Sequence, residues 1–290
     1  MPWIDSRVVN CGVFLYSSAI AAEDRERWGG SGFLLGIRSE QYSELAHVYA
    51  VTNDHVCHSF PVVRHRLGVR EAKDEDWIPH PDGDDVAVMP FGFLPWREWP
   101  FIEGDTLLSE LNVLQMGGGP GDDCLMVGKF VVDEVGRQLD RPVVRFGNLA
   151  MMNEKIRQEE RAFEQDSFLV DMRSLPGYSG SPVVLYWEKT AVMSWTVHAT
   201  PDSIIGQRGV MDRSWLLGID WGHPGRTQPV LDADGNPVPQ GLRVRTNTGL
   251  SAVVPAWKLA TLLELPELVA SRHEAETTYA QQPDGAVPDS

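Results

Sequence analysis

The segment PGYSGSPVV, residues 176–184, surrounds one hydroxyl group with residues that leave the backbone bare. Gly177 and Gly180 would let the chain turn tightly around Ser179, so that backbone N–H groups point at an oxygen of a bound molecule. A nucleophilic serine needs such an oxyanion site and a nearby base. The same residue types are also typical of an ordinary turn before a strand. The motif alone does not decide between these two interpretations.

Among the eight histidines, His55 has the context expected of a base. It stands between the strand-like segment VYAVTND and the residues VC, and a strand-to-turn boundary holds a side chain rigidly. Two alternatives stay open: a surface histidine that caps a turn, or a metal ligand together with Cys57 and His58. A structural zinc site normally has four ligands, and Cys11 and Cys124 are isolated in the sequence. We therefore expect no metal and no cofactor.

A carboxylate beside the imidazole would fix its tautomer and stabilise the imidazolium ion. The segment PHPDGDDVAVMPF offers Asp82, Asp84 and Asp85. Only Asp85 directly precedes the apolar residues VAVM, which predicts a partly buried position at the entrance of a strand. Asp82 and Asp84 fit better in the preceding turn. Asp84 is the second choice.

The elements that must position these side chains are mostly short strands. Segments such as GSGFLLGI, AHVYAVTND, CLMVGKFVV and SWLLGIDWG are separated by clusters of Gly, Pro, Asp and Asn, which predicts a β-sandwich or β-barrel. Residues 153–165 are interpreted as a surface helix or an extended loop. PAWKLATLLELPELVASR predicts a helix that Pro255 opens and Pro266 breaks or kinks. DADGNP lacks the later glutamate of a calcium loop, so we expect a hairpin turn there.

Composition restricts the partners. The chain has 290 residues, 42% of them hydrophobic, and a formal net charge of -16, so neither nucleic acid nor an anionic membrane is expected to bind it. No run of 18 apolar residues predicts a membrane span, and the N-terminus lacks the pattern of a signal peptide. The three cysteines are scattered, which fits reduced thiols in a cytoplasmic protein.

Taken together, the motifs resemble those of trypsin-like serine peptidases with the chymotrypsin fold, and in particular their bacterial HtrA-like branch. TNDHV resembles the histidine motif, DDVAV the aspartate motif and GYSGSP the nucleophile motif, in the order His, Asp, Ser of this fold. GGSGFLLGI, LLGIDWG and NTGLSAVVPAWKL resemble further strands, so the likeness covers roughly residues 29–263. No PDZ-like segment is expected after it.

The resemblance implies an all-β fold of two six-stranded antiparallel β-barrels followed by a C-terminal helix. The first barrel would carry His55 and Asp85, and the second would carry Ser179. The implied parts are residues 1–104, 105–254, 255–270 for the helix, and 271–290 for a polar tail that we expect to be disordered.

The implied activity is that of a serine endopeptidase acting through an acyl-enzyme. Ser179 would be the nucleophile, His55 the general base and acid, and Asp85 the group that orients it. The N–H groups of Gly177 and Ser179 would form the oxyanion hole.

A peptide or protein substrate would bind beside the second barrel. Its backbone would pair with the strand residues Asp220, Trp221 and Gly222. Arg173 would favour an acidic side chain in the specificity pocket.

Two positions depart from the family pattern. Tyr178 stands where digestive proteases carry an aspartate that receives a new N-terminal ammonium group, so no activation through that ion pair is expected. The protein would be active as made, or regulated by loop ordering or a partner protein. Asp220 replaces a small serine; a second carboxylate there would raise its own pKa or perturb His55.

Two alternatives stay open. One is a catalytically silent trypsin-fold module that binds an extended peptide on the strand at 220–222. The other is an unrelated β-barrel in which His55, Cys57 and His58 hold a metal.

Overall fold

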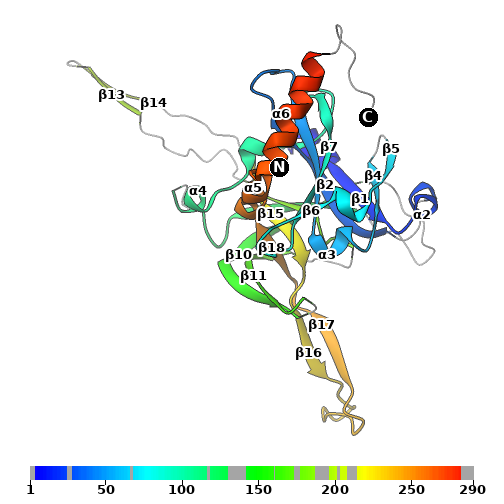
Figure 1. Ribbon diagram of the computed structural model, residues 1–290. Coiled ribbons are helices and arrows are strands. Elements are labelled where there is room, and N and C mark those ends of the chain that lie inside the picture. Colours follow the sequence, from blue (N-terminus) through cyan, green and yellow to red (C-terminus); the bar gives the residue numbers. More distant parts are fainter. Residues whose placement is uncertain are drawn as a thin grey trace.

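The computed structural model of the chain describes residues 4–24, 28–65, 68–115, 118–129, 142–159, 161–172, 177–186, 196–200, 203–207 and 214–281. Its elements form two β-sheet bodies, drawn in blue to cyan and in green to orange, with helix α6 in red (Figure 1). Among the described helices, none is long and apolar enough to cross a membrane.

The N-terminal half is an eight-stranded sheet in the order β5-β4-β1-β2-β3-β7-β6, with β8 parallel to β2. Its strands are β1 (Gly12–Tyr16), β2 (Trp28–Arg38), β3 (Leu45–Thr52), β4 (Val62–His65), β5 (Gly68–Glu71), β6 (Ile78–Pro79), β7 (Ala87–Pro95) and β8 (Ile102–Glu103). Every residue of β3 is buried, and β3 leads directly to the short helix α3 (Asp54–Cys57). The other helical turns in this half are α1 (Ser6–Asn10), α2 (Ala19–Glu23), η1 (Asp74–Asp76) and η2 (Gly104–Thr106).

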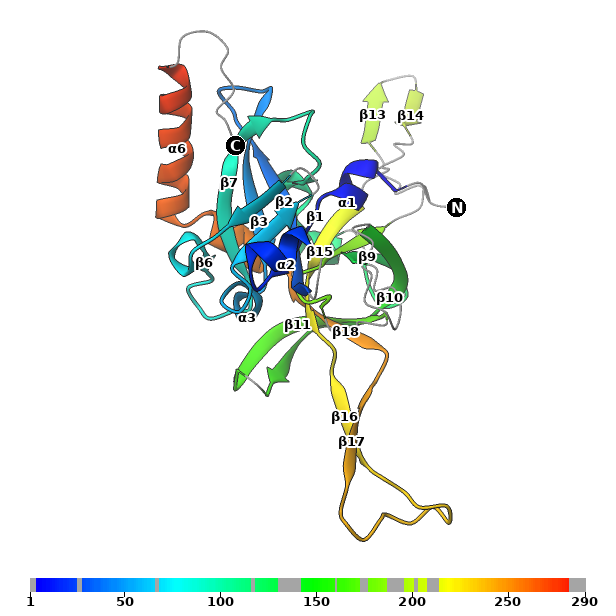
Figure 2. The ribbon, with the colours of Figure 1, turned by 90° about the vertical axis from the view of Figure 1, so that its right-hand side faces the viewer.

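The C-terminal half is a closed barrel in the order β10-β11-β18-β15-β12-β9. Its strands are β9 (Asp123–Lys129), β10 (Pro142–Gln158), β11 (Phe163–Asp171), β12 (Pro182–Tyr186), β15 (Ser214–Gly222) and β18 (Leu250–Pro255), and α4 (Glu110–Gln115) precedes them. Two further hairpins are β13 (Thr196–Thr200) with β14 (Ser203–Gln207), and β16 (Gly225–Pro229) with β17 (Arg243–Asn247). Figures 1 and 2 show β16 and β17 projecting away from the barrel.

The expected all-β double barrel with a C-terminal helix is confirmed, with one difference in detail. The C-terminal barrel closes with six antiparallel strands, whereas the N-terminal sheet is a half-barrel of eight strands. One apolar core cluster joins the two halves, since it includes Phe33 and Val51 from the sheet and Leu217 and Val253 from the barrel. Burial of this shared core fixes the two halves relative to each other.

Residues 153–165 are not a helix or a loop. They form the end of β10, a turn in which Ala162 has a φ of 51°, and the start of β11. The backbones pair from Glu154 opposite Ser167 to Gln158 opposite Phe163. This ladder outweighs the helix-forming composition of the segment.

The expected turn at DADGNP is present in the hairpin arm. Asp232 accepts hydrogen bonds from the backbone N–H groups of Asp234 and Asn236, at 3.0 and 2.9 Å. This is an Asx turn, in which the aspartate side chain accepts hydrogen bonds from the backbone that follows it.

The chain ends in two helices, α5 (Ala256–Leu263) and α6 (Pro266–Ala280), with Pro266 at the start of the second as expected. Helix α6 runs past Ser271, where the sequence predicted a tail. The reason is docking: the Tyr279 ring lies edge-on to the rings of Tyr42 and Phe93. Residues 282–290 lie outside the described range.

Candidate active site

His55 lies on α3, immediately after the buried strand β3. Asn53, at the helix start, is fully buried and donates its side-chain N–H to the backbone carbonyl of Asp85 at 2.8 Å. This bond ties the beginning of α3 to the segment that enters β7. A rigid strand end therefore sets the position of the imidazole, as the sequence suggested.

The structure brings His55 and Asp85 into contact. The ring Nδ1 of His55 lies 2.8 Å from Oδ2 of Asp85, and the backbone N–H of His55 donates to Oδ1 at 3.1 Å. Asp85 is 0% exposed, and its burial alone would raise its pKa. The hydrogen bonds and charge of His55, with the charge of Arg161, hold the pKa of this carboxyl below its ordinary value. Asp85 is thus kept ionised beside the imidazole.

Asp84, the second choice for this role, belongs to a different cluster. Its carboxylate lies 3.1 Å from Nζ of Lys258 and 3.2 Å from Nδ1 of His80, and it accepts a hydrogen bond from Gln165 at 2.7 Å. It is buried like Asp85. Two adjacent buried carboxylates therefore have separate sets of partners.

Ser179 lies on a turn that only glycine can flank. Gly177 and Gly180 both have a φ of 91°, which L side chains rarely adopt. A Cβ on Gly180 would also lie 1.8 Å from the backbone oxygen of Ser31 and 2.4 Å from Oγ1 of Thr52. The glycines that drew attention in the sequence are required by the backbone here.

Hydrogen bonds attach the serine turn to the N-terminal sheet. The backbone N–H of Ser31 donates to the carbonyl of Ser179 at 2.8 Å, and the Ser31 hydroxyl donates to the carbonyl of Gly177 at 2.7 Å. Thr52, at the end of β3, donates to the carbonyl of Ser31 at 2.7 Å. Since β3 leads into His55, the turn of Ser179 and the imidazole are anchored to neighbouring parts of one sheet. The Ser179 hydroxyl itself donates to the carbonyl of Trp221 at 3.3 Å.

The oxyanion hole stays a prediction. The direction of the Gly177 N–H depends on the peptide from residue 176, which lies outside the described residues. Arg173, proposed from the sequence for the specificity pocket, also lies outside them.

The three residues expected to hold a substrate backbone differ from one another. Asp220 is fully buried, and its carboxylate accepts a hydrogen bond from the Ser251 hydroxyl, so it offers no surface to a peptide, contrary to expectation. Trp221 and Gly222 are partly exposed. The indole N–H of Trp221 donates to the Ser167 hydroxyl at 2.9 Å, which fixes the ring.

An aromatic ring occupies the position after Gly177. Tyr178 is 1% exposed, and the guanidinium of Arg145 lies 4.8 Å from its ring centroid. A Cβ on Gly128 would lie 2.2 Å from the same ring, so the ring packs directly on the backbone of β9. Packing and a cation–π contact hold this position, where digestive proteases use a buried ion pair.

Of the residues suggested as metal ligands, His55, Cys57 and His58, the structure does not group all three: the His55 ring contacts Asp85, and Asp54 takes its place near the other two. Ligand atoms of Asp54, Cys57 and His58 do lie within 4.8 Å of one another. Burial, with the charge of Asp54, raises the pKa of the Cys57 thiol to about 12, and Asp54 pairs with Arg161 at 2.7 Å. Asp54 and the His55 ring are thus already engaged in other contacts. Cys11, Cys57 and Cys124 are all buried and form no disulfide.

Sequence reasoning missed three side chains at this site. Gln158, Arg161 and Gln165 come from the hairpin of β10 and β11 and contact Asp84 and Asp85. The hairpin reaches toward α3 in Figure 2. In the ladder Gln158 stands opposite Phe163 and Gln165 opposite Ile156, a pairing that the helix-forming composition of the segment did not reveal.

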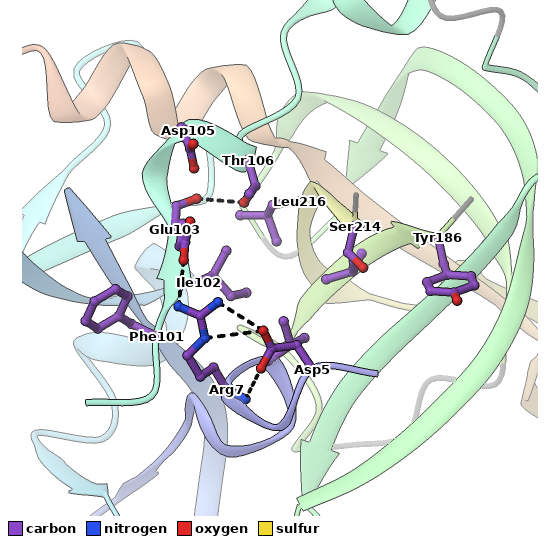
Figure 3. A pocket seen from close by; sticks show the side chains of 12 residues that line it. Asp5, Arg7, Phe101, Ile102, Glu103, Asp105, Thr106, Tyr186, Ser214 and Leu216 are labelled. Carbon is purple, nitrogen blue, oxygen red and sulfur yellow. Dashed lines mark hydrogen bonds and ion pairs between the residues drawn. The ribbon is translucent and has the colours of Figure 1, made fainter. Parts of the chain in front are cut away.

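A separate cavity of about 260 Å³ lies between the N-terminal segment and the barrel (Figure 3). Arg7 bonds Asp5 and Glu103 at its edge, at 3.0 and 2.6 Å. None of the three candidate catalytic residues lines this cavity. It is distinct from the candidate site.

Comparison with solved structures identifies the fold. The apo form of the MamO protease domain from Magnetospirillum magneticum matches with a TM-score of 0.51 and 14% identity, covering 90% of this chain and 100% of that one. This chain has the fold of a trypsin-like serine protease domain. At this identity the likeness establishes the fold, not the activity.

Two further structures are similar at lower scores. The HtrA-type protease AlgW with a decapeptide matches with a TM-score of 0.42 and 17% identity, covering 84% of this chain and 59% of that one. The protease Rv3671c in its inactive form matches with a TM-score of 0.46 and 13% identity, covering 89% of each chain. Comparisons with protein-family models and with curated proteins found no match.

Proposed function

We propose that this chain is a serine endopeptidase with Ser179 as nucleophile, His55 as general base and acid, and Asp85 as the orienting carboxylate. The hydrogen bond of 2.8 Å between the His55 ring and the buried Asp85 carries the proposal. A buried carboxylate needs charged and hydrogen-bonding partners, and the His55 ring is one of those that Asp85 has here. In a chain with this fold that also carries the glycine-flanked Ser179, proton transfer is the role that we propose for this pair.

The chemistry follows from the three groups. The Ser179 hydroxyl attacks the carbonyl carbon of a peptide bond, and His55 accepts its proton and then gives it to the leaving amine. Asp85 stabilises the imidazolium ion that exists between these steps. Water then attacks the acyl-enzyme, with His55 again as base. The N–H groups of Gly177 and Ser179 are the proposed oxyanion donors, each worth roughly 10²- to 10³-fold in rate.

The substrate is proposed to be an extended peptide. It would add to the partly exposed end of β15 at Trp221 and Gly222, beyond Ile219, the last residue of β15 in its ladder with β12. Arg173 would give a preference for an acidic side chain. Tyr178, packed against Arg145, makes activation by a new N-terminal ammonium group unnecessary at this position.

The test is covalent labelling with a fluorophosphonate probe, which reacts with an activated serine. Wild type is expected to be labelled and Ser179→Ala not. Ser181→Ala is the matched control: Ser181 is fully buried, two residues away, and its replacement should leave labelling intact.

Equal labelling of wild type and Ser179→Ala would contradict the proposal. So would a folded wild-type protein that is never labelled, a result that favours the silent peptide-binding module. Mapping of cleaved proteins with wild type against Ser179→Ala would then give the substrate class.

A further inference from the structure

The carboxylate of Asp85 is held from both halves of the molecule. Oδ2 contacts the His55 ring and also accepts a hydrogen bond from the side-chain N–H of Gln158 at 3.0 Å. Oδ1 contacts the backbone N–H of His55 and lies 3.2 Å from a guanidinium nitrogen of Arg161. Each oxygen therefore has one partner in His55 and one in the hairpin of β10 and β11. A carboxylate with both oxygens doubly contacted cannot rotate freely.

Arg161 is itself fixed in a bridging position. Its second terminal nitrogen donates to Oδ2 of Asp54 at 2.7 Å, and it lies 5.8 Å from the ring centroid of Phe163. Asp54 directly precedes His55 in the chain. The guanidinium thus connects two carboxylates that flank the imidazole, and its side chain is only 24% exposed.

The charged surroundings of His55 come from three elements. The titratable or charged groups are Asp85 before β7, Asp54 and His58 on α3, and Arg161 in the turn between β10 and β11. The cluster of Lys258, Asp84 and Asp166 lies one step further away, connected through Gln165. Arg161 is the cation in direct contact with the orienting carboxylate.

We propose that Gln158 and Arg161 are positioning residues for the triad, and that Arg161 in addition weakens the basicity of His55 by offsetting the charge of Asp85. This inference rests on the proposed function. The position where the family places a small hydroxyl residue holds Asp220 here, whose carboxylate turns instead to Ser251. The hairpin supplies donors to the orienting carboxylate from a different strand.

The two residues also contact each other, since a guanidinium nitrogen of Arg161 donates to Oε1 of Gln158 at 3.4 Å, so their effects are distinguished by pH dependence. Gln158 acts by geometry, so Gln158→Leu is expected to slow labelling roughly ten- to a hundredfold at every pH. Arg161 acts by charge. In Arg161→Gln the imidazolium ion loses a nearby repulsive cation, so His55 is expected to hold its proton to higher pH. The ratio of the labelling rate at pH 6 to that at pH 8 should then fall roughly three- to tenfold.

The experiment measures two quantities on the same proteins. One is the fluorophosphonate labelling rate from pH 5 to 9; the other is the NMR titration midpoint of the His55 ring, which needs no activity. Arg157→Gln is the matched control, because Arg157 lies on the same hairpin, is 62% exposed and pairs only weakly with Glu164 at 3.7 Å. Arg161→Lys keeps the charge without the fork and is expected to shift the midpoint less than Arg161→Gln.

Unchanged midpoints in folded Arg161→Gln and Arg161→Lys would overturn the role of Arg161. If Arg161→Gln does not fold, Arg161→Met, which also removes the charge, is compared with Arg157→Gln in its place. An unchanged labelling rate in Gln158→Leu would overturn the role of Gln158. If wild type itself is never labelled, the proposed function fails, while the NMR midpoints still decide whether Arg161 tunes His55.

Discussion

Two segments from the C-terminal half of the chain cross onto the N-terminal sheet, and they are attached in different ways. The hairpin of β10 and β11 ends in buried polar groups: Gln158 and Gln165 are 5% and 0% exposed and bond the equally buried Asp84 and Asp85. Helix α6 lies beside β7 (Figure 2) and docks through aromatic edges and partly exposed polar contacts.

The two kinds of attachment should respond differently to substitution. In a buried polar network, removal of one partner leaves another group without its hydrogen bond, at a cost of several kcal/mol for a charge. Aromatic edge contacts contribute about 0.5–1.5 kcal/mol each and tolerate small movements. The hairpin therefore holds the carboxylate of Asp85, whereas the contacts of α6 given above are with Tyr42, His47 and Phe93.

The largest effect is expected from a substitution of Asp85, the carboxylate that the hairpin of β10 and β11 contacts. Asp85→Asn should reduce the labelling rate by about 10⁴-fold, because an amide stabilises the wrong imidazole tautomer and cannot stabilise the imidazolium ion. The measurement is the rate of fluorophosphonate labelling near pH 8. The matched control is Asp84→Asn, which alters an adjacent buried carboxylate paired with Lys258.

Asp84→Asn is expected to lower the melting temperature while labelling stays close to that of wild type. If both variants lose labelling equally, the loss reflects general disruption of the network. The comparison would then have to be abandoned.

The sequence was enough to predict the double barrel and to choose His55 and Asp85, which the structure brings into contact. Strand alternation and a strand end are local patterns, so a single sequence can reveal them; Ser179 as nucleophile stays a prediction. The contacts that orient Asp85 are not local: Gln158 lies 73 residues and Arg161 107 residues from the carboxylates they bond, Asp85 and Asp54. No pattern within the segment 153–165 specifies such partners.

The same reason explains why the sequence did not predict that helix α6 continues past residue 271. Residues 271–280 are polar, so composition favoured a tail. Glu276 accepts a hydrogen bond from Ser39, 237 residues away, and lies 3.2 Å from the ring of His47. The oxyanion hole and Arg173 stay predictions, because they depend on residues outside the described part of the chain.

A smaller effect should appear on the α6 side. Tyr279→Ala removes ring contacts with Tyr42 and Phe93, at centroid distances of 4.9 and 5.6 Å, and should lower the free energy of unfolding by about 1–2 kcal/mol. Labelling well below the melting temperature should not change. Thr278→Ala, exposed on the same helix, is the control and should stay within about 0.5 kcal/mol of wild type. A labelling defect in Tyr279→Ala would mean that α6 reaches the triad after all.

The smallest expected effect is a change in how the stability of the protein depends on pH. His47 stacks on Phe93 with centroids 4.5 Å apart and lies against Glu276 of α6. Burial lowers the pKa of His47, and this outweighs the opposing effect of Glu276. The unfolded chain therefore binds the proton more readily, so this contribution to stability is present above the ordinary value of 6.5 and is lost as the pH falls below it. Glu276, whose pKa is lowered from 4.5, loses its contribution only in more acidic solution.

The measurement is the melting temperature at pH 7 and pH 5. Wild type should lose more stability over this interval than His47→Gln, with a difference of about 1–3 °C. His47→Gln removes the stacked ring, so it should melt lower at pH 7 but depend less on pH. Thr278→Ala, exposed on α6 and uncharged, is the control and should keep the wild-type slope. A wild-type protein that gains stability toward pH 5 relative to His47→Gln would show that pairing with Glu276 outweighs burial, and that α6 is attached by charge as the hairpin is.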